Sequence, residues 1–115
     1  MENDLLFTLI YKDDWKEYTK TGYFEPKELS ELGHIRCFEG KFAERMANQF
    51  FNESEYLLLI VIDPLRIHEP MKRSKEVDID FTTIHGKFSI DAIIDRISLK
   101  KSKKGEFNIR IKHFD

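Results

Sequence analysis

The amino-acid sequence predicts a small α+β domain with a mixed or antiparallel, twisted sheet and two main helices. The prediction rests on apolar runs of strand length, on one amphipathic helical stretch, and on a short helix near the start. With 115 residues, the chain is long enough for one ordinary hydrophobic core and too short for two. We therefore expect a single domain over residues 1–115.

Three segments predict the central strands. Leu5–Tyr11 and Tyr56–Ile62 are near-continuous apolar runs, a pattern typical of strands that are buried on both faces. The second run is closed by Asp63 and Pro64. Between the two runs, residues 33–38 predict a short extended segment.

Two helices are predicted in the first half of the chain. Either Asp13 or Asp14 could cap a short helix that ends at Gly22, and Asp14 with Glu17 has the spacing of a capping box. Residues 24–29 then predict a connecting loop. A longer helix is predicted over residues 41–52.

The longer helix has an apolar stripe. Phe42, Met46 and Phe50 recur at a spacing of four, and they predict the buried face of an amphipathic helix. Ala43, Ala47 and Phe51 widen this stripe, whereas Asn48 is expected to face away from the core.

The second half of the chain is less regular. Residues 66–80 predict a loop or a weak edge strand, and residues 81–86 predict a second loop. Apolar residues at 90–97 predict another strand, and the lysine-rich residues 100–105 predict a hairpin turn. Alternation over residues 106–113 predicts a half-exposed last strand.

Composition narrows the classes of function. The net charge of −2 lacks the basic surplus of a general polyanion binder, and no aromatic residue interleaves the lysines of residues 100–104, so nucleic acid is not an expected partner. The single cysteine, Cys37, cannot form an internal disulfide and is expected in the core. No stretch has the length of a membrane span or the pattern of a signal peptide, which predicts a cytoplasmic protein.

Several phrases, taken in order, resemble the bacterial domain of unknown function 952 family. The similarity covers residues 6–99. It is carried by Phe7–Leu9, Trp15, Gly33–Phe38, Ala47–Phe51, Ile62–Pro64, Phe81–Gly86 and Asp91–Ile93.

The resemblance implies a fold similar to that of the ADP-ribosyltransferases, which bind NAD in a cleft between two sheet halves. The family histidines fall at Thr8, Arg36 and Thr83 in this chain, and Glu76 is the nearest replacement for a glutamate that falls near Ser74. Threonine cannot act as a general base near neutral pH, and arginine has no acceptor capacity. Catalysis by the family pattern is therefore not expected.

A candidate cleft follows from the strand periodicity. His34 and Arg36 are two residues apart, so they project to the same side of a strand, and Thr8 could join them from the first strand. Arg36 suits a phosphate or a carboxylate because its planar fork can form two parallel hydrogen bonds. The alternative is a structural ion pair with an acidic side chain.

Thr83, His85 and Glu76 complete the predicted ligand-binding set. His85 could instead pack within its loop, since the family has a tyrosine there, and Glu69 is an alternative carboxylate. The four histidines are scattered, so no metal site is expected.

The sequence leaves three functions open. The favoured one is a non-catalytic binding module for a small nucleotide-like ligand such as NAD or ADP-ribose, without a resident cofactor. The second is an enzyme that acts on NAD or an ADP-ribose derivative, with His34 or His85 for recognition. The third is a protein-interaction factor, such as an immunity factor, an antitoxin or an inhibitor.

Overall fold

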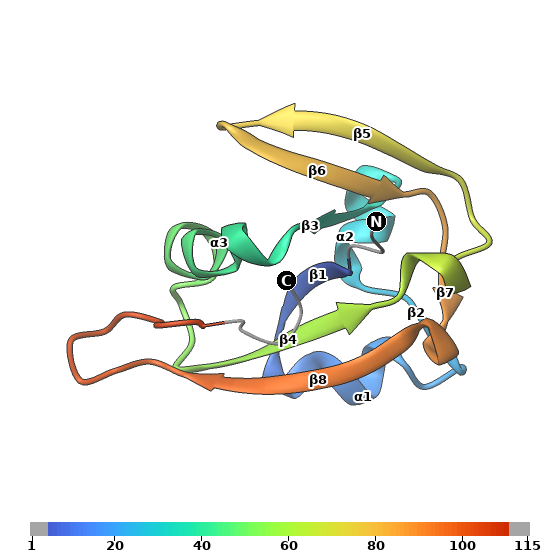
Figure 1. Cartoon of the computed structure of the whole chain (residues 1–115). Helices are drawn as coiled ribbons and strands as arrows, with labels where there is room; N and C mark the ends of the chain where they lie inside the picture. The colour runs from blue at the N-terminus through green and yellow to red at the C-terminus, as the bar shows by residue number, and fades with distance from the viewer. Residues whose placement is uncertain (1–4, 111–115) are drawn as a thin grey trace.

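Six antiparallel strands form the main sheet of the computed structural model, which describes residues 5–110. In spatial order these strands are β5 (Met71–Glu76), β6 (Ile79–Ile84), β3 (Ile35–Phe38), β1 (Leu6–Tyr11), β4 (Tyr56–Ile62) and β8 (Ile93–Lys100). A second sheet pairs β2 (Tyr23–Phe24) with β7 (Phe88–Ser89). The predicted α+β class is confirmed (Figure 1).

Short helices connect and cover these strands. The α-helices are α1 (Trp15–Tyr18), α2 (Lys27–Leu32) and α3 (Ala43–Phe50). The 3-10 helices are η1 (Lys12–Asp14), η2 (Gly40–Phe42), η3 (Pro64–Arg66) and η4 (Ile90–Ala92). Within residues 5–110, no helix is long and apolar enough to cross a membrane.

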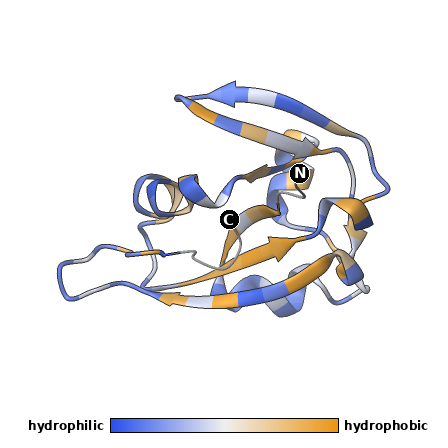
Figure 2. Cartoon of the chain, viewed as in Figure 1, coloured by the Kyte–Doolittle hydropathy of each residue, from blue (hydrophilic) through white to orange (hydrophobic). Residues whose placement is uncertain are grey.

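The core lies on both faces of the sheet because β1 and β4 are apolar at almost every position. On β1, Phe7 and Leu9 pack on the face covered by α3, while Leu6 and Ile10 pack on the opposite face. That opposite face is also covered by Trp15 of α1. Figure 2 shows the contrast between the hydrophobic β4 and the largely hydrophilic edge strand β5.

The first helix is shorter than predicted, and its cap is different. Asp14 lies in a helical conformation at the end of η1, and its side chain makes no capping hydrogen bond. A capping side chain requires an extended backbone at its own residue. The capping-box prediction is therefore wrong, although a short helix is present.

A helix replaces the connecting loop predicted over residues 24–29. α2 begins directly after Pro26 and ends at Gly33, whose φ of 82° lies in the left-handed region. The Gly33 amide closes the helix on the Leu29 carbonyl at 2.9 Å. Proline just before a helix and glycine just after it are common helix boundaries, so Pro26 and Gly33 could have predicted α2 from the sequence.

The least regular part of the sequence forms a hairpin. The edge-strand alternative for residues 66–80 is confirmed by β5, but the loop predicted over residues 81–86 is wrong, because most of it belongs to β6. The turn places Val77 and Asp78 at positive φ (45° and 64°), as tight hairpin turns require. Arg45 of α3 donates to both carbonyls of this turn.

The stripe of α3 is narrower than predicted. Met46, Ala43 and Ala47 are buried, whereas Phe50 is 47% exposed at the end of the helix. Phe51 packs against Tyr11 instead, with ring centroids 5.5 Å apart.

The last strand predicted over residues 106–113 is absent from the described residues 106–110. The Asn48 side chain takes the place of a partner strand, because its Oδ1 accepts from the Phe107 amide at 2.8 Å and its Nδ2 donates to the Phe107 carbonyl at 2.9 Å. The inward alternation of Phe107 and Ile109 is still observed. Residues 111–113 lie outside the described residues. The predicted turn is confirmed where the Gly105 amide donates to the Ser102 carbonyl.

The strand predicted over residues 90–97 begins later than expected. The Ser89 hydroxyl accepts a hydrogen bond from the Asp91 amide at 3.1 Å, which stabilises the turn η4 in place of an extended backbone. β8 then runs from Ile93 to Lys100 beside β4.

Candidate functional site

The main sheet divides into two halves between β1 and β3. Among residues 5–110, one pair, Phe7 with Phe38, keeps these two strands in register, whereas six pairs join β1 to β4 and four join β3 to β6. The halves β5-β6-β3 and β1-β4-β8 therefore separate beyond this pair. A buried backbone needs other partners where a ladder ends.

Side chains supply these partners at Arg36. The Thr8 hydroxyl donates to the Arg36 carbonyl at 3.0 Å. The Glu28 carboxylate, which extends from α2, accepts from the Arg36 amide at 2.5 Å. The joint between the two halves is thus closed by side chains from β1 and α2.

Five of the six predicted site residues lie on one face of the β5-β6-β3 half, the face on which α3 packs. Arg36 stands opposite Thr83 in the register, and Thr83 stands opposite Lys72. Alternation along the three strands brings further side chains to this face. We call the set the polar cluster: His34, Arg36, Lys72, Glu76, Thr83 and His85, together with Glu28.

Thr8 does not belong to this face. Its neighbours Leu6 and Ile10 pack on the opposite side of the sheet, and the Thr8 hydroxyl donates to the Arg36 carbonyl. It lines a hollow of about 190 Å³ together with Glu28 and Ile35, and neither His34 nor Arg36 lines that hollow.

Arg36 is ion-paired on two sides. Its Nε lies 3.4 Å from Glu28, and its Nη1 lies 3.3 Å from Glu76. The guanidinium also stands 5.5 Å from the Phe81 ring centroid. Of the two alternatives for Arg36, the structure therefore shows the ion pair, and contact with a ligand stays a prediction.

The other end of the polar cluster is an imidazole pair. The rings of His34 and His85 lie 5.3 Å apart, and His85 Nε2 lies 2.8 Å from the Thr83 hydroxyl. Thr83 Oγ1 also lies 3.3 Å from the Lys72 carbonyl, to which it donates. Desolvation lowers the pKa of His85, and the positive charges of Lys72 and His34 lower it further.

This arrangement can recognise an anion more readily than it can perform acid–base chemistry. His34, His85 and Lys72 form no ion pair with any residue that the structure describes. Glu76, the predicted carboxylate, is held by Arg36. The two threonine hydroxyls already donate to carbonyls.

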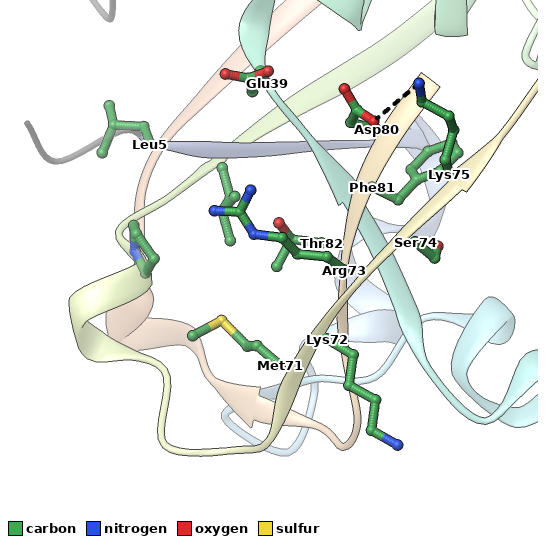
Figure 3. A pocket seen from close by; sticks show the side chains of 12 residues that line it. Leu5, Glu39, Met71, Lys72, Arg73, Ser74, Lys75, Asp80, Phe81 and Thr82 are labelled. Carbon is green, nitrogen blue, oxygen red and sulfur yellow. Dashed lines mark ion pairs between the residues drawn. The ribbon is translucent and has the colours of Figure 1, made fainter. Parts of the chain in front are cut away.

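A separate hollow lies on the other face of the β5–β6 hairpin. It has a volume of about 690 Å³ and is lined by Met71, Arg73 and Thr82 together with Leu5 and Leu6. Figure 3 shows the Arg73 side chain reaching into it, with the 4.0 Å ion pair of Lys75 and Asp80 at its rim. None of the predicted site residues lines this hollow.

Cys37 is a core residue, as predicted. It is fully buried, and burial together with the nearby Glu28 carboxylate raises the pKa of its thiol. A protonated, inaccessible thiol is not a nucleophile. Among residues 5–110, no three His, Cys, Asp or Glu side chains are grouped closely enough to hold a metal ion.

Sequence reasoning missed Glu28 and Lys72. Glu28 was assigned to a loop, and only recognition of the helix between Pro26 and Gly33 would have placed it near β3. Lys72 required the pairing of β5 with β6, for which its exposed, charged segment gave little signal.

The fold and the polar cluster define a small α+β domain whose divided sheet carries polar side chains on one half. The chain belongs to the family described as "Protein of unknown function (DUF952)", whose model matches residues 9–96. No curated protein matches the chain in sequence.

Solved structures confirm the fold. The crystal structure of protein CC0527 from Caulobacter crescentus is similar with a TM-score of 0.79, at 17% identity over 90% of this chain and 93% of that chain. A crystal structure of its double mutant gives the same values. The solution NMR structure of CC0527 has a TM-score of 0.72, at 17% identity over 89% of this chain and 90% of that one.

Proposed function

We propose that this protein is a non-catalytic binding module for a small nucleotide-like ligand, built on a scaffold similar to that of the ADP-ribosyltransferases. The ligand carries phosphate, as NAD and ADP-ribose do, and it binds at the polar cluster. The protein acts as a cytoplasmic receptor for this ligand and does not turn it over.

The observation that carries this proposal is the unpaired positive end of the polar cluster. His34, His85 and Lys72 lie together without a carboxylate partner in residues 5–110; desolvation lowers the pKa of His85, and the charges of Lys72 and His34 lower it further. A bound phosphate would relieve the repulsion among these charges, because an opposite charge stabilises the protonated imidazole.

The lack of a free catalytic carboxylate or base in the polar cluster supports binding without turnover. A catalytic carboxylate has to be free to accept a proton or to stabilise positive charge. Glu76 is committed to Arg36 at 3.3 Å, and neither Thr8 nor Thr83 can supply a base.

Titration calorimetry with thermal-shift measurements tests the binding. The ligands are NAD, ADP-ribose, AMP and nicotinamide. A ligand that binds only the folded chain raises the unfolding midpoint by mass action. We expect a shift with the phosphate-bearing ligands and none with nicotinamide, and tighter binding at pH 6 than at pH 8.

Variants locate the site. His34→Ala and Lys72→Ala should each weaken binding about tenfold, the usual effect of losing one hydrogen bond to a charged group. Lys87→Ala is the matched control, since Lys87 is an exposed lysine that stands 4.8 Å from the Tyr23 ring centroid. No shift with any ligand, or equal weakening by Lys87→Ala, would overturn the proposal.

An enzyme acting on NAD is the second candidate, because Glu76 and the two histidines share one face of the sheet. It predicts NAD consumption that Glu76→Gln abolishes. Turnover equal to that in buffer, with and without acceptors, would eliminate this candidate and leave the binding module.

A further inference from the structure

A second polar surface lies on the β1-β4-β8 half, away from the polar cluster. It is a groove of about 480 Å³ between β8 and the segment formed by η1 and α1. We call it the basic groove. Its lining residues are Lys12, Asp13, Trp15, Lys16, Leu58, Arg96 and Ser98.

The register explains how β8 forms one wall. Lys100 stands opposite Tyr56 and Ser98 stands opposite Leu58. Directly opposed residues of antiparallel strands project to the same face, so Arg96, Ser98 and Lys100 project to the same side of β8. Lys100 does not line the basic groove itself and lies about 13 Å farther along β8 than Arg96, at the usual rise of a strand.

Basic side chains outnumber acidic ones in and beside the groove. Lys12, Lys16, Arg96 and Lys100 form no ion pair with any residue between 5 and 110. Asp13 is the single acidic residue of the lining. Four unpaired cations on a chain of net charge −2 mark a local positive field on an acidic protein, which attracts anions.

Aromatic rings stand among these cations. The Arg96 guanidinium lies 4.4 Å from the Trp15 ring centroid. The Lys12 and Lys100 ammonium groups each lie 5.7 Å from the Tyr56 ring centroid. Tyr56 is 43% exposed, so its ring remains accessible from solvent.

We propose that the basic groove binds single-stranded nucleic acid. Proteins that bind single strands combine a positively charged groove, which follows the phosphates, with aromatic side chains on which bases stack. Stacking requires an unpaired base, so a duplex does not satisfy Tyr56. The lysine-rich turn has no aromatic residue within its own sequence, but the fold places Tyr56 of β4 and Trp15 of α1 beside the basic side chains.

Fluorescence anisotropy with a labelled oligothymidylate of about ten nucleotides, within the usual site sizes, tests the proposal on the full chain. We expect binding at low salt that weakens as salt is added. The slope of log K against log salt should reach about −3, at about −0.7 for each of four phosphate contacts.

Two variants separate the charge from the ring. The double variant Lys12→Gln with Arg96→Gln should weaken binding more than tenfold and reduce the slope by about half. Tyr56→Leu should weaken binding by about fivefold or more with an unchanged slope, as expected for a lost stacking contact. The matched control is Lys103→Gln with Lys104→Gln, which removes the same charge from the exposed turn.

Unfolding curves first verify that each variant is folded. Absence of binding by the wild type would overturn the proposal. So would equal weakening by the control variant, or equal affinity for a duplex or for inorganic polyphosphate, since each of these means charge attraction without base recognition. The residues differ from those of the polar cluster, so this test and the nucleotide test succeed or fail independently.

Discussion

The polar cluster and the basic groove both gather positive side chains, but they differ in how that charge is balanced. In the polar cluster, Arg36 lies between two carboxylates at 3.4 and 3.3 Å. In the basic groove, Arg96 faces an indole ring and has no carboxylate partner in residues 5–110. Arg36 therefore has a structural role between the two halves of the sheet, whereas we propose that Arg96 binds an external anion.

This comparison indicates that the role of a charged side chain depends on whether it has an oppositely charged partner within the protein. Removing one partner of a partly buried pair leaves an uncompensated charge and destabilises the fold. Removing an unpaired surface charge costs little. The same distinction applies inside the polar cluster. Arg36 forms ion pairs with two carboxylates, whereas His34 and His85 form none among residues 5–110.

Glu28→Ala should have the largest effect on stability. It removes a carboxylate that accepts from the Arg36 backbone and pairs with its side chain, and hydrogen bonds to charged groups contribute about 1.5–3 kcal/mol. Urea unfolding measures the loss. Glu31→Ala on the same helix is the control, because its pair with Lys27 is exposed and contributes less than about 0.5 kcal/mol. Equal losses for the two variants would refute a structural role of the balanced cluster.

Thr8→Val should cost about 1 kcal/mol, since it removes one buried hydrogen bond at nearly constant volume. Thr82→Val makes the same substitution on β6, where no hydrogen bond of the hydroxyl is present among the described residues, and it should be nearly neutral. Urea midpoints at equal slope compare the two. A neutral Thr8→Val would mean that side chains do not close the joint between the halves.

Lys16→Gln in the basic groove should change the free energy of unfolding by less than about 0.5 kcal/mol. Lys16 has no ion pair within residues 5–110, so removing its charge breaks no such contact. Urea unfolding at low and high salt provides the measurement. A loss as large as that of Glu28→Ala would show that this cation is balanced after all.

The smallest effect is a pH dependence from His85. Its folded pKa lies below the ordinary value of 6.5, so the unfolded chain binds more protons in this range. Stability should therefore be complete above about pH 6.5 and should fall as pH decreases from there toward the folded pKa. Comparing unfolding midpoints of the wild type and His85→Gln at about pH 7.5 and pH 5.5 isolates this dependence. An identical decline in both proteins would exclude His85 as its source.

The sequence predicted the parts of the fold that have strong local signals. The runs around β1 and β4 and the stripe of α3 are long enough to identify their elements. β6 was missed because Asp80, Thr82 and Thr83 interrupt its apolar positions, so alternation was not recognised. β6 forms a strand because it pairs with β3 on one side and with β5 on the other. β3 is distant in sequence, and β5 is highly charged.

The sequence singled out five residues that the fold brings to one face, but it also grouped Thr8 with them and missed Glu28 and Lys72. A period of two placed His34 with Arg36, whereas Thr83 and His85 were chosen from the family resemblance in a segment predicted as a loop. The register of β3 with β6 brings the two pairs together. Which carboxylates would reach Arg36 depends on the position of α2 and on the hairpin that holds Glu76. The aromatic neighbours of the groove lysines likewise depend on tertiary structure. The lysine-rich residues 100–104 have no aromatic residue among them in the sequence, and for this reason nucleic acid was not predicted as a partner.

Amide NMR of the isotope-labelled full chain, with the arginine Nε–H signals included, tests most directly whether unbalanced charges are the ones that bind. Adding ADP-ribose should shift the signals of His34, Lys72 and His85 and leave the Arg36 Nε–H signal in place. Adding the oligothymidylate should shift the Arg96 Nε–H signal and the indole signal of Trp15. Shifts centred on Arg36 with either ligand, or no shift with both, would contradict the account.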